Sequence, residues 1–165
     1  MICPACGYEN LSGADECDEC STPLSQLGGI PNPTGGVQRE LMENAIRDVE
    51  VRDPIVVSKN ASAKEVITQM REKRIGCALI VEGKELIGIF TERDILQRLT
   101  EPGIKLSEID IQNVMTAAPE VLRESDSIAY ALNKMAMGNF RHVPFQRKNG
   151  GFAVLSVRDI LHAFF

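Results

Sequence analysis

From residue 37 onward, short apolar runs alternate with stretches whose apolar residues share one helical face. The first such stretch predicts an amphipathic helix, with five apolar positions among charged residues: Val37, Leu41, Ala45, Ile46 and Val49. A short strand is expected at 55–57. The helix after it has a buried stripe of Val66, Ile67 and Met70, and Ser62 with Glu65 predicts a capping box at its start.

Two further strands are expected at 77–81 and 86–90, and Gly83 marks the turn between them. A last helix begins after Thr91. The order of elements is therefore β-α-β-β-α, in a unit of about 60 residues.

The same order returns 65 residues later, and the two copies align without a gap: GIFTERDIL at 88–96 is matched by AVLSVRDIL at 153–161. The second copy has expected strands at 121–122, 142–146 and 152–155, with a strong hairpin signal at Asn149-Gly150. Its helix has the stripe Ile128, Ala131, Leu132 and Met135. Other matched positions are Pro54 with Pro119, Ser62 with Ser127, and Met70 with Met135.

Each copy ends in a corner where an apolar strand reaches a hydroxyl residue, Thr91 or Ser156, followed three positions later by Asp94 or Asp159. A hydroxyl residue and an acid at this spacing form a capping box at a helix start. Duplication would copy a cap as readily as a ligand site. The spacing alone therefore favours capping, although one residue pair can serve both purposes.

Composition is that of an ordinary globular protein, with 165 residues of which 44% are hydrophobic and 25% charged. The apolar runs are too short to span a bilayer, and the N-terminus lacks the basic and apolar regions of a secretory signal. We therefore expect a cytoplasmic protein without a membrane segment. The net charge of -5 arises in residues 1–38, which hold five acidic residues and no Lys or Arg.

Four of the five cysteines have the spacing C-x2-C-x10-C-x2-C, and they are Cys3, Cys6, Cys17 and Cys20. Four thiolates make the closed tetrahedral shell of a structural zinc site. Gly7, just after the second cysteine, can take the positive φ that turns N–H groups toward sulfur, and Ser21 stands at the same place in the second pair. Residues 1–24 resemble a zinc ribbon of the CPxCG type.

Other uses of these cysteines are weighed against one zinc ion. Disulfides or free thiols are disfavoured by the spacing and by a reducing compartment, whereas iron in a rubredoxin-like site would use the same ligands. A closed site has no open position for catalysis, so we interpret the metal as a staple for a segment too short to bury a core. Phosphate contacts need Lys or Arg, so direct binding of nucleic acid is not expected.

The two copies resemble the tandem cystathionine β-synthase (CBS) domain pair, or Bateman module. The resemblance is carried by GIFTERDIL at 88–96, RHVPF at 141–145, SVRDIL at 156–161 and Met115-Thr116-x-x-Pro119. It implies an α/β (α+β) fold with two β-α-β-β-α units related by a pseudo-two-fold axis. The predicted division is a zinc ribbon at 1–24, a flexible Pro/Gly-rich linker at 25–36, a first CBS unit with its leading helix at 37–103 and a second CBS unit at 104–165.

The resemblance implies an adenosine ligand, because many members of that family bind AMP, ADP, ATP, NAD or S-adenosylmethionine in clefts between the copies. Asp94 and Asp159 are suitable carboxylate acceptors for two ribose hydroxyls, and Thr91 and Ser156 at helix starts favour phosphate. By resemblance, the base and phosphates would meet Pro54, Ile55, Val56, Thr116, Ala118, Val121, Arg141, His142, Val143, Pro144 and Arg158.

The copies differ where phosphate would bind. The charged Arg141-His142 of the second copy corresponds to Gly76-Cys77 in the first, which supplies no charge. The second site is therefore better suited to a ligand with phosphate, although it has Ala153 where the first has Gly88.

The leading functional hypothesis is a regulatory protein, since the sequence offers no nucleophile with a base, no paired catalytic carboxylates and no open metal site. It would sense an adenine nucleotide, form a homodimer through the CBS pair, and use the ribbon for stability or to dock a protein partner. An iron-containing redox protein is the alternative. A transcription regulator is a weaker one, because no cluster of basic residues stands out.

Overall fold

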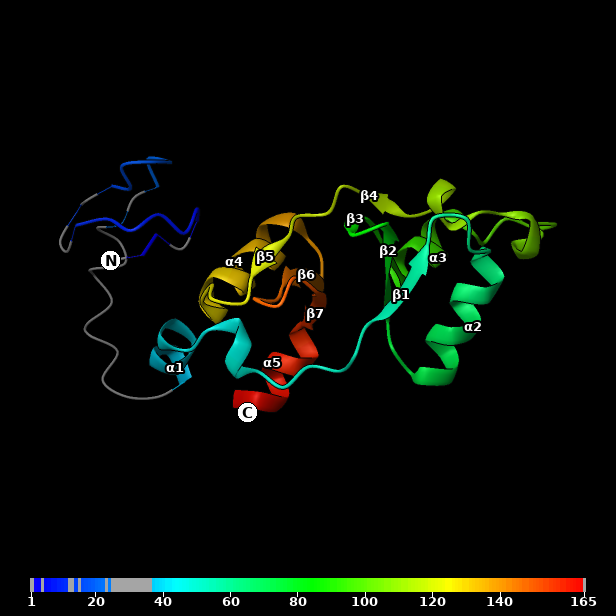
Figure 1. The fold of residues 1–165 in the computed structure, drawn as a ribbon. Helices are drawn as coiled ribbons and strands as arrows, with labels where there is room; N and C mark the ends of the chain where they lie inside the picture. Colours follow the sequence, from blue (N-terminus) through cyan, green and yellow to red (C-terminus); the bar gives the residue numbers. More distant parts are fainter. Residues whose placement is uncertain are drawn as a thin grey trace. The chain divides into compact units, whose positions relative to one another are not determined.

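The computed structural model describes residues 2–3, 5–11, 14, 16–22, 24 and 37–164 (Figure 1). The predicted linker at 25–36 lies outside these residues. The chain forms two compact units from interleaved segments: unit 1 is Met1–Glu50, Leu122–Val143 and Leu155–Phe165, and unit 2 is Val51–Val121 and Pro144–Val154. The predicted division into ribbon, linker and two CBS units stays a prediction.

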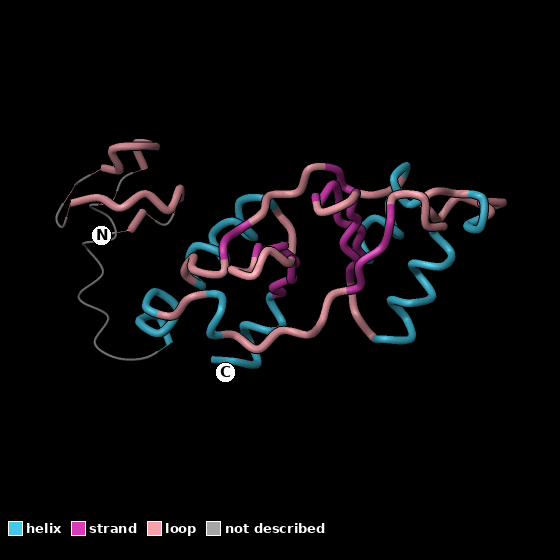
Figure 2. The backbone as a smooth tube through the Cα atoms, in the orientation of Figure 1, coloured by secondary structure: helices cyan, strands magenta, loops and turns pink. Residues whose placement is uncertain are grey.

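Unit 2 is built on a four-stranded sheet in the order β1-β2-β3-β4. Strands are drawn in magenta in Figure 2. β1 (Ile55–Ser58) runs parallel to β2 (Cys77–Glu82), and β2 pairs antiparallel with β3 (Glu85–Thr91). β3 also pairs antiparallel with the two-residue β4 (Thr116–Ala117). The three longer strands confirm the predictions to within one residue at each end. β4 was not predicted, because two residues carry no periodic signal.

Helix α2 (Ala63–Lys73) joins the parallel strands β1 and β2, as a parallel connection requires. The Ser62 hydroxyl accepts a hydrogen bond from the Glu65 N–H at 3.2 Å, which confirms the predicted cap. Ala63, Val66 and Met70 are buried in one core with residues of β1, β2 and β3. Helix α3 (Glu92–Arg98) and the 3-10 turns η2 (Leu106–Glu108) and η3 (Ile111–Asn113) complete the unit.

Unit 1 contains α1 (Val37–Glu43), η1 (Ile46–Asp48), α4 (Ile128–Gly138) and α5 (Val157–Phe164). β5 (Leu122–Arg123) forms a sheet with β6 (His142–Gln146) and β7 (Phe152–Ser156), and the last two strands have residues in both units. The predicted stripe of α4 is buried at Ile128, Ala131 and Met135. Among the described residues, no helix is long and apolar enough to cross a bilayer.

The segment that leads into each copy bonds to the helix start of the other copy. In unit 2, Ala63 N donates to Ile109 O and Ile111 N to Ala61 O, both at 2.8 Å. The equivalent hydrogen bonds in unit 1 run from Ile128 N to Asn44 O at 3.1 Å and from Ile46 N to Asp126 O at 2.9 Å. The sequence prediction assigned the leading helix to the first copy, whereas the segment after it bonds to the second. This exchange explains why the chain up to Glu50 belongs to the same unit as the helix of the second copy.

Candidate functional site

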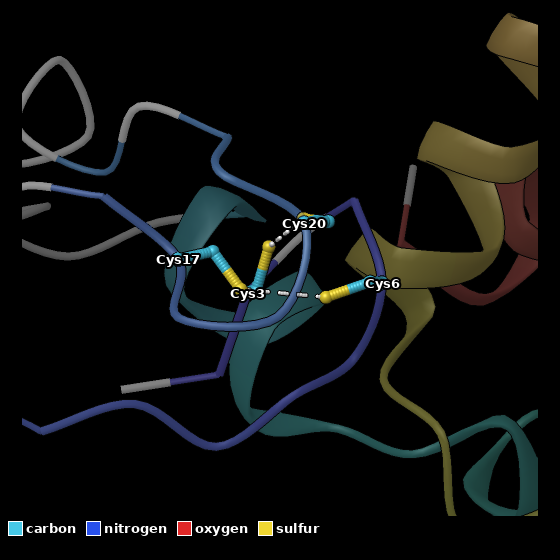
Figure 3. Close-up of side chains that lie close together, drawn as sticks. All are labelled: Cys3, Cys6, Cys17 and Cys20. Carbon is cyan, nitrogen blue, oxygen red and sulfur yellow. Dashed lines mark hydrogen bonds between the residues drawn. The ribbon is translucent and has the colours of Figure 1, made fainter.

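The four N-terminal cysteines converge (Figure 3). Their sulfur atoms all lie within 4.8 Å of one another, with Cys3 and Cys20 at 3.6 Å and Cys6 and Cys17 at 3.5 Å. A tetrahedral site with metal–sulfur bonds of about 2.3 Å places its sulfurs about 3.8 Å apart. The four residues therefore fit a four-thiolate metal site.

The two C-x2-C turns share one backbone geometry. Gly7 N donates to Cys3 O at 2.9 Å, and Ser21 N donates to Cys17 O at 2.9 Å. Gly7 has φ 75°, the positive value that the sequence predicted, and Ser21 has φ 54°. Ser21 thus adopts the left-handed conformation in spite of its Cβ atom, so the second turn matches the first.

The thiols of the cluster ionise unequally. Burial raises the pKa of the Cys6 thiol to about 12. Burial also opposes ionisation of Cys17, but the Cys20 and Glu19 N–H groups and the amide of buried Asn10 outweigh it and lower the pKa of Cys17 to about 6. The N–H donors around Cys17 therefore favour its thiolate, the form in which cysteine binds a metal ion.

At the first corner, Asp94 is 4% exposed and both of its carboxylate oxygens are in use. Oδ2 accepts hydrogen bonds from Thr91 N at 2.8 Å and Thr91 Oγ1 at 2.7 Å. Oδ1 accepts a hydrogen bond from Thr116 Oγ1 at 3.0 Å and lies 3.7 Å from Arg98 Nη2. Thr91 and Asp94 form the predicted capping box, and the corner is closed by groups of the protein.

At the second corner, half-buried Asp159 uses one carboxylate oxygen for the cap. Its Oδ2 accepts from Ser156 N at 2.8 Å and Ser156 Oγ at 2.6 Å, and Asp159 N donates back to Ser156 Oγ at 3.2 Å. Among the residues that the structure describes, Oδ1 has no hydrogen-bond partner. This corner therefore repeats the cap of the first and keeps a free acceptor.

The other predicted ligand residues are distributed over both units. Pro54, Ile55 and Val56 lie at β1 in unit 2, with Ile55 buried and Val56 50% exposed. In the second-copy set, Thr116, Ala118, Val121 and Pro144 belong to unit 2, whereas Arg141, His142, Val143, Ser156, Arg158 and Asp159 belong to unit 1. That these residues form one site stays a prediction.

Sequence reasoning missed Arg98, which acts at the first corner. Arg98 Nη1 donates to Val114 O at 2.9 Å and also to Met115 O, while the guanidinium faces Asp94. The pair of Arg98 with Asp94 could have been predicted from their spacing, because residues four apart on a helix are neighbours. No local pattern predicts the hydrogen bonds of Arg98 to the two carbonyl groups.

Comparison with known proteins assigns the fold. Residues 46–101 match the family model of the CBS domain. A CBS-domain protein from Agrobacterium tumefaciens superposes with a TM-score of 0.67 at 24% identity, over 74% of this chain and 100% of the other. The chain has the fold of CBS-domain proteins. The predicted α/β (α+β) class is confirmed, and the two aligned copies correspond to a CBS pair.

Two further similarities are to a protein of Arabidopsis thaliana and to a protein of Pyrobaculum aerophilum. A CBS domain-containing protein of Arabidopsis thaliana is 32% identical over 136 residues, which is 81% of this chain and 25% of that relative. The chain thus spans about a quarter of the length of this plant protein. A CBS-domain protein of Pyrobaculum aerophilum, solved as a complex with AMP, is 27% identical with a TM-score of 0.64, over 73% of this chain and 98% of the other. Neither carries the name of an enzyme.

Proposed function

We propose that the protein is a non-catalytic sensor that binds an adenosine-containing nucleotide at the second corner. The observation that carries this proposal is the free Oδ1 atom of Asp159, on a carboxylate that the cap with Ser156 holds in place. A carboxylate fixed in this way needs no reorganisation to accept a ribose hydroxyl, and such a charge-assisted bond contributes about 1.5–3 kcal/mol. The AMP complex of the Pyrobaculum protein supports adenosine as the ligand class.

The remaining contacts follow from the family resemblance. Exposed Arg141 and half-buried His142 are cationic or hydrogen-bonding partners for phosphate, and Arg158 on α5 is a weaker one. The apolar contacts to the base stay a prediction, since Val143 and Pro144 are buried and Ala118 and Val121 belong to the other unit. AMP, ADP, ATP, NAD and S-adenosylmethionine all carry the adenosine group that this proposal requires. The corner of Thr91 and Asp94 is less suited to such a ligand, because both carboxylate oxygens of Asp94 already accept hydrogen bonds.

Isothermal titration of the full chain with each of these five compounds tests the proposal. At least one should give a saturable heat, and Asp159→Asn should weaken its affinity by about 10- to 150-fold. Asp48→Asn is the matched control, because Asp48 also caps a short helix, accepting from Ala45 N at 2.8 Å, and has no predicted ligand role. No heat with any compound, or equal losses in both variants, would sink the proposal.

We further propose that the four cysteines hold one structural zinc ion, which would stabilise the ribbon and leave it able to dock a protein partner. The closed shell of four thiolates supports a structural role, since it leaves no position for a substrate. Iron in the same shell is the alternative, with a redox role. A metal analysis and a visible spectrum distinguish the two: zinc gives a colourless protein, and an iron-thiolate colour would favour the redox protein.

We also propose that the chain forms a homodimer through its CBS pair. Leu96 on α3 and Leu161 on α5 are 70% and 51% exposed, and they occupy matching positions of the repeat. Exposed apolar side chains at matching positions are suited to a self-complementary interface. Light scattering of the full chain should give twice the monomer mass, and Leu161→Glu should shift it toward the monomer; a monomeric wild type would overturn this assignment.

A further inference from the structure

The chain segment between the two copies is fastened to the first corner. We call residues 114–118 the connector. Its β4 part pairs with β3, with Thr116 opposite Ile89 and Ala117 opposite Gly88. Arg98 binds the carbonyl groups of Val114 and Met115, and Thr116 donates to Asp94. The contacts therefore join consecutive residues of the connector to β3 and α3.

Gly88 is part of the same arrangement. A Cβ atom at this position would overlap the sulfur of Met115, so the Met115 side chain occupies the space that only glycine leaves. Gly88 does not have a positive φ. Glycine is needed here because the connector approaches closely, and not for its backbone freedom.

Most of the hydrogen-bonding capacity of Asp94 is engaged in this arrangement. A carboxylate has about four acceptor sites. Thr91 supplies two donors and Thr116 a third, Arg98 is the facing cation, and the residue is 4% exposed. A ribose diol that donates two hydrogen bonds to Asp94 would therefore have to displace one of these donors, and displacing Thr116 would release the connector.

The second copy keeps the cap but lacks the residues that fasten the connector. One repeat away, Gly88 corresponds to Ala153, Arg98 to Ala163 and Thr116 to Val51. None of these three supplies a hydroxyl, a guanidinium or the space of a glycine. The absence of the fastening residues accounts for the free Oδ1 atom at Asp159.

We infer that the first corner is a latch, in which Asp94 is a positioning residue that holds the connector through Thr116 rather than a ribose acceptor. With Asp94 engaged in this way, the chain takes one nucleotide, at the second corner. The statement about ligand rests on the proposed function, whereas the latch itself does not.

The latch is tested without ligand by a double-variant cycle. Asp94→Asn and Thr116→Val should each lower the urea midpoint of unfolding, and the double variant should unfold at no lower urea than Asp94→Asn alone, because both remove one interaction. The 13C-methyl resonance of Met115, assigned by its loss in Met115→Leu, should move in both single variants and return in Thr116→Ser, which restores the hydroxyl. Additive losses with an unchanged Met115 resonance would overturn the latch.

Titration with AMP tests the ligand statement separately. The wild type should bind one AMP per chain, and Thr116→Val should keep that stoichiometry with a loss of affinity below about tenfold. Two AMP per chain in the wild type, falling to one in Asp94→Asn, would identify Asp94 as a ligand residue and overturn the inference. If no nucleotide binds, the proposed function fails, and the urea cycle and the Met115 resonance still decide on the latch.

Discussion

The two corners of the repeated fold share one local structure, but their carboxylates differ in how many hydrogen-bond acceptor sites are still free. Both Asp94 and Asp159 accept two hydrogen bonds on Oδ2 from the hydroxyl residue that caps the helix. At the first corner, Oδ1 also accepts a hydrogen bond from Thr116, which is 22 residues away in sequence. At the second corner the described residues leave Oδ1 without a partner.

This difference separates two properties of one motif: its helix cap and its availability for a ligand. A cap depends on residues three positions apart, so it is copied whenever the segment is duplicated. Availability for a ligand depends on residues elsewhere in the chain, and those diverge freely after duplication. A repeated motif is therefore sound grounds for a repeated fold, and each site must be judged by what surrounds it.

The largest expected effect comes from removing the proposed zinc ion. If the ion is present, chelation should unfold the ribbon, because a structural zinc ion contributes on the order of 10 kcal/mol to such a segment. Acidification should act in the same direction, since the thiolates are protonated as the metal leaves. Limited proteolysis should then cut within residues 1–24 and spare the rest. A general loss of protection in the apo protein would show that the corners depend on the ribbon.

Gly88→Ala should give the next largest effect, and it addresses the latch directly. The added methyl group overlaps Met115, and overpacking of this kind costs about 1–3 kcal/mol of unfolding free energy. Gly151→Ala is the matched control, since its Cβ would meet only Asn149 Oδ1 at an ordinary 3.5 Å. It should change stability by less than about 0.5 kcal/mol. Equal stability of the two variants in urea would contradict a tightly seated connector.

Asp94→Asn and Asp159→Asn compare the carboxylates themselves. Asp94 is buried, so Asp94→Asn would deprive Thr91 and Thr116 of acceptors and lower the free energy of unfolding by about 1–3 kcal/mol. Asp159 is half-buried and loses only its cap contacts, about 0.5–1 kcal/mol. Urea unfolding should therefore rank Asp94→Asn as the less stable variant. The ranking should reverse in titrations with nucleotide, and the same order in both measurements would remove the distinction between the corners.

Much of this arrangement could be predicted from sequence because it is local. The strands of both copies, the cap at Ser62 and the convergence of four cysteines all follow from periodicity or spacing. Thr91 with Asp94 was predicted as a cap on the same grounds, and it forms one. These features need only residues that are near one another along the chain.

The remaining features depend on contacts between distant residues. Thr116 was predicted to meet a ligand, and in the structure its hydroxyl meets Asp94. The exchange of leading segments, seen at Ile46 and Ile111, joins residues some 50 to 80 positions apart, and no local pattern encodes which helix a segment will bond. Such contacts are fixed by the packing of the whole domain.

The smallest expected effect distinguishes a specific contact from general charge. Arg98→Lys keeps a cation four residues after Asp94 but cannot bond two carbonyl groups and face the carboxylate at once, because an ammonium group lacks the planar fork of a guanidinium. Part of its side chain is exposed, so the loss should be about 0.5–1 kcal/mol. Arg158→Lys is the control, since Arg158 is exposed and makes no hydrogen bond or ion pair to the part of the chain that the structure describes. Urea midpoints measured in low and high salt complete the test. A loss of stability in Arg98→Lys that persists in high salt reflects the bonds to the carbonyl groups. A loss that salt abolishes would show that Arg98 acts only as a surface charge, and Thr116 would then be the side chain that ties the connector to Asp94.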